Sequence, residues 1–476
     1  MLIGRSNLVT IFGNSSQLYI VISFAVILSF LTPDYIGFYI LSVLLILLFL
    51  LFKEKFILFS ITVLLLALVG EINPTLRLVI QLMAILLLIS IVLRKYGFDI
   101  KKYPRVPLPV LSFIIFLYTA LTISILNSDY SFAAIPLVLR LSAFFVFVYL
   151  FFVMIKSVGD VRLYIYAIIV SAIIMAVGTF YDFMDTGFNL LMIAGEIYRT
   201  GGFMSNFNAT GGYFAIAIPL LISSLYVSKV KTTKIMISAI IGLLFIALMI
   251  TGSRSALLAC AVSGFIILFI LNKKLLVRIT VSLVLAILIM MLIEPVRNFL
   301  ILALRVESGL AQRDQLWEIS LNLIEDNFLF GIGPGAYASK MFDYFPVMLN
   351  SYHGQRLIGL YEMTTGTNSA HNFYLIMFTD LGILGLLVSL MLPYVFFKIS
   401  KTVLTLLKKS KNNSYYLAVG ATGAMTGLLV RALFDGINIL SYGWISVDLP
   451  FWLMFSMLAY FYNNITTVKK QLVEFQ

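Results

Sequence analysis

The chain has few of the residues that build disulfides and metal sites. Its 476 residues include one cysteine, Cys260, and two histidines, His353 and His371. A single cysteine excludes an intramolecular disulfide and a cysteine-based metal site, and two histidines are too few for a histidine cage. We therefore expect neither a bound metal nor another cofactor.

Charged residues are also scarce. Asp, Glu, Lys and Arg make up 11% of the sequence, hydrophobic residues make up 61%, and the mean hydropathy of +1.05 excludes a soluble globular protein. A bilayer core of about 30 Å needs roughly 20 apolar residues in a helix. Fourteen runs of about this length begin near Leu18, Tyr35, Lys55, Thr75, Pro107, Pro136, Val161, Gly212, Thr233, Arg254, Leu276, His371, Tyr415 and Trp444. The composition predicts an all-α polytopic membrane protein, with about 12–14 transmembrane helices in a single domain over residues 1–476.

Signals for processing and for repeats are missing as well. No small-residue cleavage site follows the first apolar stretch, so we expect an ordinary first helix and not a cleavable signal peptide. The sequence contains no internal repeat, no low-complexity tract and no segment with the composition of a soluble domain.

The 33 basic residues form two sets when alternate loops are placed on opposite sides of a membrane. One side carries 18 Lys and 5 Arg, and the other carries 9 Arg and 1 Lys together with most of the acids. The positive-inside rule makes the lysine-rich side cytoplasmic, with both termini there. The net charge of +12 is therefore a signal of orientation and not of nucleic-acid binding.

Two of the predicted outer loops are long, residues 182–211 and residues 294–370. The second is too long for a bare connection, so we expect it to carry structure of its own. Residues 308–326 indicate an amphipathic helix with Ser308 as N-cap. Its apolar face would hold Leu310, Trp317, Leu321 and Ile324. We expect this helix on the outer membrane surface or over a cavity between helices, ending at the glycines of segment 331–335.

The strongest local pattern is His371-Asn372, followed after nine residues by Gly382-Ile383-Leu384-Gly385. His371 would lie at the outer mouth of a helix, where its neutral imidazole can accept a proton from a hydroxyl. The two glycines would allow close helix packing and so hold the histidine in place. A simple capping histidine at the membrane interface explains the same position equally well.

Asp380 lies nine residues after His371, about 13 Å along the helix and on its opposite face. A direct pair between them is therefore not expected. An acid at that depth needs a partner, and packing against Arg140 or Arg431 accounts for it as well as a catalytic role does. Both arginines fall near helix interiors and should face the inside of the bundle. His353 has no such setting and is assigned to a surface loop.

Arginines on the outer side suit a phosphate ligand. A planar guanidinium donates two parallel hydrogen bonds and keeps its charge. Arg254 stands at a helix end in Thr251-Gly252-Ser253-Arg254-Ser255, where oriented N–H groups would add to an anion site. Arg313 and Arg199 lie in the two long loops. Pairing with outer acids or lipid headgroups is the alternative for each one, but the near absence of lysine favours phosphate binding by at least two of the set.

Together these segments resemble the O-antigen ligase and O-antigen polymerase superfamily. The resemblance rests on His371-Asn372-x9-Gly382-x-x-Gly385, Gly252-Ser253-Arg254-Ser255, the Arg313…Trp317 helix and the Gly331-x-Gly333-x-Gly335…Tyr337 turn. Arg199-x-x-Gly202-Phe203…Asn208 resembles another outer-loop motif of these proteins, with Phe207 where many members have proline. The similarity covers roughly residues 199–385.

The resemblance implies a GT-C-like, inverting, metal-independent glycosyltransferase of lipopolysaccharide biosynthesis in the bacterial inner membrane. Its site would face the periplasm, and its donor would be a glycan on undecaprenyl diphosphate. By the same resemblance His371 activates the acceptor hydroxyl and Asn372 orients the histidine. Arg254 and Arg313 would bind the diphosphate leaving group, and Arg199 and Arg305 are further candidates for that role.

Several functions stay open at this point. A ligase transfers the whole glycan to lipid A–core, a polymerase joins repeat units on the lipid carrier, and a third relative glycosylates protein hydroxyls. The histidine pattern favours the ligase. A flippase or transporter would also need many helices and a few buried arginines, but such proteins usually have internal repeats and helices interrupted at the midplane.

Overall fold

We analysed a computed structural model of the chain, which describes residues 54–68, 74–189, 199–204, 206–304, 313–341, 369–409 and 412–464. Within these ranges 82% of residues are helical and none is in a strand. The expected all-α polytopic membrane fold is confirmed.

The helices follow one another along the chain with short connections. They are α4 (Glu54–Val63), its π-helical continuation η1 (Leu64–Leu68), α5 (Pro74–Tyr96), the short turn η2 (Ile100–Lys102), α6 (Leu108–Leu126), α7 (Ser131–Met154), α8 (Val158–Asp185), the turn η3 (Gly202–Met204), α10 (Phe207–Val227), α11 (Lys231–Ile250), α12 (Arg254–Leu271), α13 (Lys273–Leu292), α14 (Glu294–Leu304), α15 (Arg313–Asp326), α16 (Tyr337–Lys340), α18 (Phe373–Leu407), α19 (Asn413–Arg431) and α20 (Ile445–Asn463).

Nine helices in the described part of the chain are long enough and apolar enough to cross a membrane, and they coincide with nine of the fourteen expected spans. Those expected near Lys55, Thr75 and Tyr415 are also helical, as α4 with η1, α5 and α19. The two expected near Leu18 and Tyr35 lie outside the described residues. Helix α14 was not expected, because the sequence assigns its residues to the long second loop.

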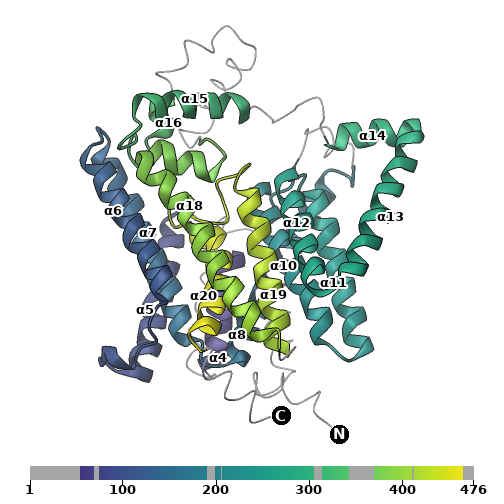
Figure 1. Cartoon of the computed structure of the whole chain (residues 1–476), viewed down its shortest axis with the longest axis horizontal. Helices are drawn as coiled ribbons and strands as arrows, with labels where there is room; N and C mark the ends of the chain where they lie inside the picture. The colour runs from purple at the N-terminus through teal and green to yellow at the C-terminus, as the bar shows by residue number, and fades with distance from the viewer. Residues whose placement is uncertain are drawn as a thin grey trace.

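Consecutive crossing helices alternate in direction, and this separates the two sets of basic residues. Helices α14, α15 and α16 lie at one end of the bundle, where α12 and α18 begin with Arg254 and Phe373 (Figure 1). We call this the arginine-rich end. The turn η2 with Lys101 and Lys102 lies at the other end of the bundle, which we call the lysine-rich end (Figure 1).

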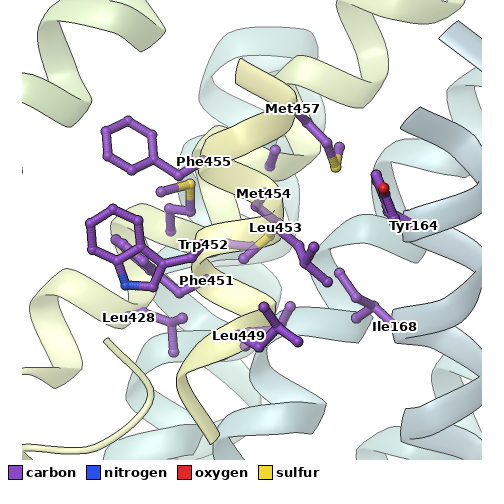
Figure 2. Packing of buried hydrophobic residues seen from close by; sticks show 14 of the residues in the cluster. Tyr164, Ile168, Leu428, Leu449, Phe451, Trp452, Leu453, Met454, Phe455 and Met457 are labelled. Carbon is purple, nitrogen blue, oxygen red and sulfur yellow. The ribbon is translucent and has the colours of Figure 1, made fainter. Parts of the chain in front are cut away.

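Helix α20 lies in the middle of the largest apolar core. Figure 2 shows Trp452 and Phe455 on one side of α20 and Leu453 on the other side, where Ile168 of α8 lies. Trp452 is 1% exposed, and its indole donates a hydrogen bond to the Ile439 carbonyl at 2.7 Å. A helix that is apolar all round is one that other helices surround.

Helices α10, α12 and α19 pack closely on one another beside this core. Gly427 of α19 makes the approach possible, because a Cβ there would lie 2.2 Å from the Ala259 carbonyl oxygen of α12. Small residues let membrane helices come this near. The packing brings the arginine-rich ends of the three helices together.

Helix α18 is broken at Gly382, which has φ +63° and ψ −153°. The break leaves backbone N–H and C=O groups of α18 without partners in the helix, and the turn after α15 forms hydrogen bonds with them. Ile332 and Gly333 donate to the Thr379 and Asp380 carbonyls at 3.0 Å each, and Ile383 donates to the Phe328 carbonyl at 2.8 Å. Gly382 of the motif therefore docks a loop and not, as the sequence suggests, a neighbouring helix, and Gly385 lies against Met377 of α18 itself.

The apolar face of α15 differs from the expected one. Ile324 is buried as expected, but so are Leu316, Ile319 and Leu323, whereas Leu321 is 56% exposed. Trp317 lies at the edge of the buried face, so the true face is turned by about one residue, or 100°, from the predicted one. The expected N-cap Ser308 and the face residue Leu310 lie outside the described residues.

Candidate active site

His371 directly precedes α18 and has an unusual backbone conformation. Its φ is +47°, in the left-handed region that few non-glycine residues occupy. The next residue, Asn372, holds the helix start, because its Oδ1 accepts hydrogen bonds from the N–H groups of Tyr374 (2.9 Å) and Leu375 (3.1 Å). Asn372 is therefore the N-cap. The His371 side chain is left 42% exposed at the arginine-rich end.

Asp435, just beyond the end of α19, faces the histidine. Its Oδ1 lies 3.9 Å from Nδ1 of His371, which is too long for a hydrogen bond but near enough for an ion pair with a protonated imidazole. Its Oδ2 accepts a hydrogen bond from Arg431 Nη2 at 3.2 Å. Burial raises the pKa of the Asp435 carboxyl, but the charges of Arg431, His371 and Arg313 outweigh burial and leave its pKa below the ordinary value.

Arg431 is fully buried and joins three elements of the site. Besides Asp435, its guanidinium donates to Oγ of Ser255 at 3.2 Å, to the carbonyl of Asn208 at 2.7 Å, and to Oδ1 of Asn438. Every nitrogen of the fork thus has an acceptor, which a buried arginine requires. The side chain ties the starts of α10 and α12 to the connection between α19 and α20.

Arg254 is the first residue of α12 and is half-buried. The preceding Ser253 does not cap the helix with its side chain. Its hydroxyl instead donates to Oδ1 of Asn208 at 2.9 Å. The first N–H groups of α12 therefore have no serine cap and stand beside Arg254, an arrangement that suits an anion.

Arg199 lies on the same part of the arginine-rich end. Its Nη2 donates to the Gly252 carbonyl at 3.0 Å, one residue before Ser253. Its guanidinium stacks on the ring of Phe207 at 3.5 Å from the centroid. Phe207 therefore helps to hold this arginine against the start of α12.

Helix α15 covers the histidine side of the cluster. The indole of Trp317 donates to the Ala370 carbonyl at 2.9 Å, one residue before His371, and its ring lies 6.3 Å from that of Phe434. Arg313, in the first turn of α15, acts electrostatically on both Arg431 and Asp435. The helix that carries Arg313 is thus fixed beside the His371–Asp435 pair.

Five of the six residues named from the sequence lie at the arginine-rich end, and these are His371, Asn372, Arg254, Arg313 and Arg199. The sixth, Arg305, lies outside the described residues, as does His353. Sequence reasoning did not find Asp435. The signal was the Arg431-x-x-x-Asp435 spacing, which places the two groups on one side of a helix turn.

Two expectations about buried charges were wrong. Arg140 does not face the bundle interior, because its side chain is exposed. Its guanidinium donates hydrogen bonds to the carbonyls of Tyr442 (2.7 Å) and Ser441 (3.4 Å). The partner of Asp380 is not an arginine. Tyr442 donates its hydroxyl to Asp380 Oδ2 at 2.5 Å, and the Gly335 N–H donates to the same oxygen at 3.2 Å.

Comparison with known protein families bears directly on this cluster. Residues 237–390, roughly one third of the chain, match the family model described as O-antigen ligase. Over this stretch the chain is similar to O-antigen ligases, and the match supports the O-antigen ligase superfamily. The matched region includes α12 with Arg254, α15 with Arg313 and the His371–Gly385 segment. No curated protein matches the chain at a significant level.

This match supports a glycosyltransferase of the ligase or polymerase type that acts on lipid-linked glycans in a membrane. Asp435 and Arg431 lie beyond the matched region, and Asn208 and Arg199 precede it. These four residues of the cluster therefore come from segments outside the family match.

Proposed function

We propose that this chain is an O-antigen ligase, which transfers a glycan from undecaprenyl diphosphate to a hydroxyl of lipid A–core. The reaction would take place at the periplasmic face of the inner membrane, with both termini cytoplasmic. Each polar group of the cluster belongs to the arginine-rich end, and the positive-inside rule places that end outside the cytoplasm.

The proposed reaction is a single displacement that inverts the anomeric centre. The acceptor oxygen attacks the anomeric carbon while the bond from that carbon to the diphosphate oxygen breaks, and its electron pair leaves with the undecaprenyl diphosphate. The hydroxyl proton passes to His371. No metal is needed in this scheme, because arginines neutralise the charge that develops on the leaving group.

Asp435 supports the proton-acceptor role of His371. Its Oδ1 lies 3.9 Å from Nδ1, so the carboxylate favours the imidazolium that forms when the other ring nitrogen takes the proton. Asn372 positions the histidine through the backbone, because both amide hydrogen bonds of its side-chain oxygen hold the start of α18. This geometry favours a positioning role for Asn372 over contact with the substrate.

Arg254 and Arg313 are proposed to bind the diphosphate, with Arg199 and Arg305 as further ligands. Arg254 has the open N-terminus of α12 beside it, and Arg313 belongs to the first turn of α15. Guanidinium groups and helix N–H groups are both suited to phosphate oxygens. Arg431 is fully buried and each of its three nitrogens already donates to a protein acceptor, so we assign it to the scaffold.

The observation that carries the proposal is the Arg431–Asp435 ion pair at 3.2 Å. It connects the histidine to the start of α12 through Ser255. The proposed proton acceptor thereby faces a carboxylate that Arg431 connects by hydrogen bonds to the proposed anion-binding end of α12. Glycosyl transfer from a diphosphate leaving group to a hydroxyl is a reaction that uses both groups.

The test is reconstitution of the purified chain with an undecaprenyl-diphosphate-linked glycan and lipid A–core. Transfer to the core, with inverted configuration at the new linkage by NMR, is the expected result. A ladder of longer glycans on the carrier without core transfer would replace the ligase with a polymerase. Transfer only to a protein hydroxyl would assign a protein O-glycosylating enzyme. Movement of the lipid-linked glycan across vesicles without any new glycosidic bond would assign a flippase.

A further inference from the structure

An apolar groove of about 200 Å³ lies between α6, α7 and α20. Val110 and Ile114 line it from α6, Phe145 and Phe152 from α7, and Trp452 and Phe455 from α20. Among the groups lining the groove, only Tyr149 and Ser456 bring a hydroxyl. A groove of this composition suits a hydrocarbon chain.

The groove runs toward the lysine-rich end, away from His371. Arg105 directly precedes the lining residue Val106, and Lys156 lies four residues after the lining residue Phe152, just beyond the end of α7. Helix α20 ties both residues to this end. Asn463 donates to the Arg105 carbonyl at 2.6 Å, and Tyr460 donates to the Lys156 carbonyl at 3.1 Å. Arg105 and Lys156 therefore border the end of the groove.

The charges at this border differ from others at the lysine-rich end. Lys55 and Lys95 form ion pairs with Asp160 (2.8 Å) and Glu54 (2.6 Å). Lys156 is exposed, and its ammonium lies over the ring of Tyr96 at 4.5 Å from the centroid. Arg105 is exposed as well. The border thus presents positive charge to the membrane surface, directly above an apolar groove.

We propose that the groove binds an anionic phospholipid of the leaflet at the lysine-rich end. One acyl chain would lie between α6, α7 and α20, and the phosphate would lie between Arg105 and Lys156. Basic residues at this depth attract anionic headgroups, and their apolar stems can lie along the acyl chain. The site is separate from the proposed transferase site and does not depend on it.

Trp452 makes the proposal measurable, because it lines the groove and is one of only three tryptophans. Replacing Trp317 and Trp444 with Phe leaves Trp452 as the single fluorescent reporter. In micelles, phospholipids with brominated acyl chains quench a tryptophan that they contact. We expect dibrominated phosphatidylglycerol to quench Trp452 at a mole fraction roughly tenfold lower than dibrominated phosphatidylcholine.

Two variants in this background separate the headgroup from the chain. Arg105→Gln/Lys156→Gln should remove most of the preference for phosphatidylglycerol, whereas the matched double variant Lys273→Gln/Lys274→Gln, at the start of α13, should keep it. Ser456→Leu should reduce quenching by both lipids, because it fills part of the groove.

Equal quenching by the two lipids in the single-tryptophan protein would overturn the proposal. A preference that survives loss of Arg105 and Lys156 would overturn it as well, and so would displacement of the phospholipid by equimolar undecaprenyl phosphate.

Discussion

His371 and Asp435 face each other at the arginine-rich end, with Nδ1 and Oδ1 3.9 Å apart. His371 precedes α18 and Asp435 follows α19, and 63 residues separate them in the sequence. The carboxylate is 1% exposed and the imidazole 42% exposed. The pair therefore has a buried, charged member that is fixed by Arg431 and an open member that a substrate hydroxyl can reach.

Replacing His371 with Ala should abolish glycan transfer. A positioned general base contributes about 10²–10⁴-fold to a rate, so we expect a loss in that range in the reconstituted assay, with unchanged expression and unchanged thermal unfolding. His353→Ala is the matched control, since the sequence gives that histidine no role. Full activity of His371→Ala would remove the proton-acceptor assignment and leave leaving-group stabilisation by the arginines as the main effect.

Replacing Asp435 with Asn should destabilise the protein in a pH-dependent way. The pKa of this carboxyl is lowered in the folded state, so the pair contributes stability above the unfolded pKa of about 3.9, and that contribution is lost as pH falls through the folded pKa. Breaking one side of a buried ion pair costs about 3–5 kcal/mol. We expect the melting temperatures of the two proteins to differ most above about pH 5 and to converge in acid.

The control for Asp435→Asn is Glu318→Gln, an exposed acid on α15. Its effect should stay within about 0.5 kcal/mol at every pH. A constant difference between the Asp435→Asn protein and the parent from neutral to acid pH would contradict the charge argument, because a lost packing contact has no such titration.

Much of the fold follows from local sequence, because about 20 apolar residues in a row have few alternatives to a membrane-crossing helix. Arg254 and His371 could be placed at helix ends for the same reason. Two features could not be predicted. The break at Gly382 depends on acceptors and donors in the distant turn after α15. The pairing of His371 with Asp435 depends on how α18 and α19 pack, which no local pattern contains.

The arginines show the same limit at the level of single side chains. Sequence treats Arg140 and Arg431 alike, as charges near helix interiors. The structure separates them, because Arg431 finds acceptors on α10, α12 and Asp435, whereas Arg140 extends to the backbone of Ser441 and Tyr442 at the surface. Partners supplied by other helices decide whether an arginine is buried.

Replacing Gly382 with Ala should loosen the contact between α18 and the turn after α15. The residue has φ +63°, and a Cβ would lie 2.4 Å from the Leu329 carbonyl oxygen. Strain in this backbone region alone costs about 1–3 kcal/mol. We expect a lower melting temperature and faster proteolysis of the segment that carries Arg313.

Gly242→Ala in α11 is the control, because a Cβ there meets nothing within 4 Å, so it should be neutral or stabilising by at most about 1 kcal/mol. Equal melting temperatures for the two variants would show that the break does not need glycine.

Replacing Arg254 with Lys and with Gln should distinguish a phosphate fork from a point charge. If Arg254 binds the diphosphate as it leaves, Gln loses both the charge and the donors, and we expect kcat to fall by about 10²–10³-fold, as for other lost transition-state donors. Lys keeps the charge but not the two parallel hydrogen bonds, so a loss of about 10-fold is expected.

The measurement is transfer rate against donor concentration, together with inhibition by pyrophosphate, which should weaken in the same order. Arg278→Gln, an exposed arginine of α13 at the lysine-rich end, should change neither quantity. If Arg254→Gln raised only the KM for the acceptor, Arg254 would belong to the acceptor site, and Arg313 would be left as the described arginine with the strongest claim on the leaving group.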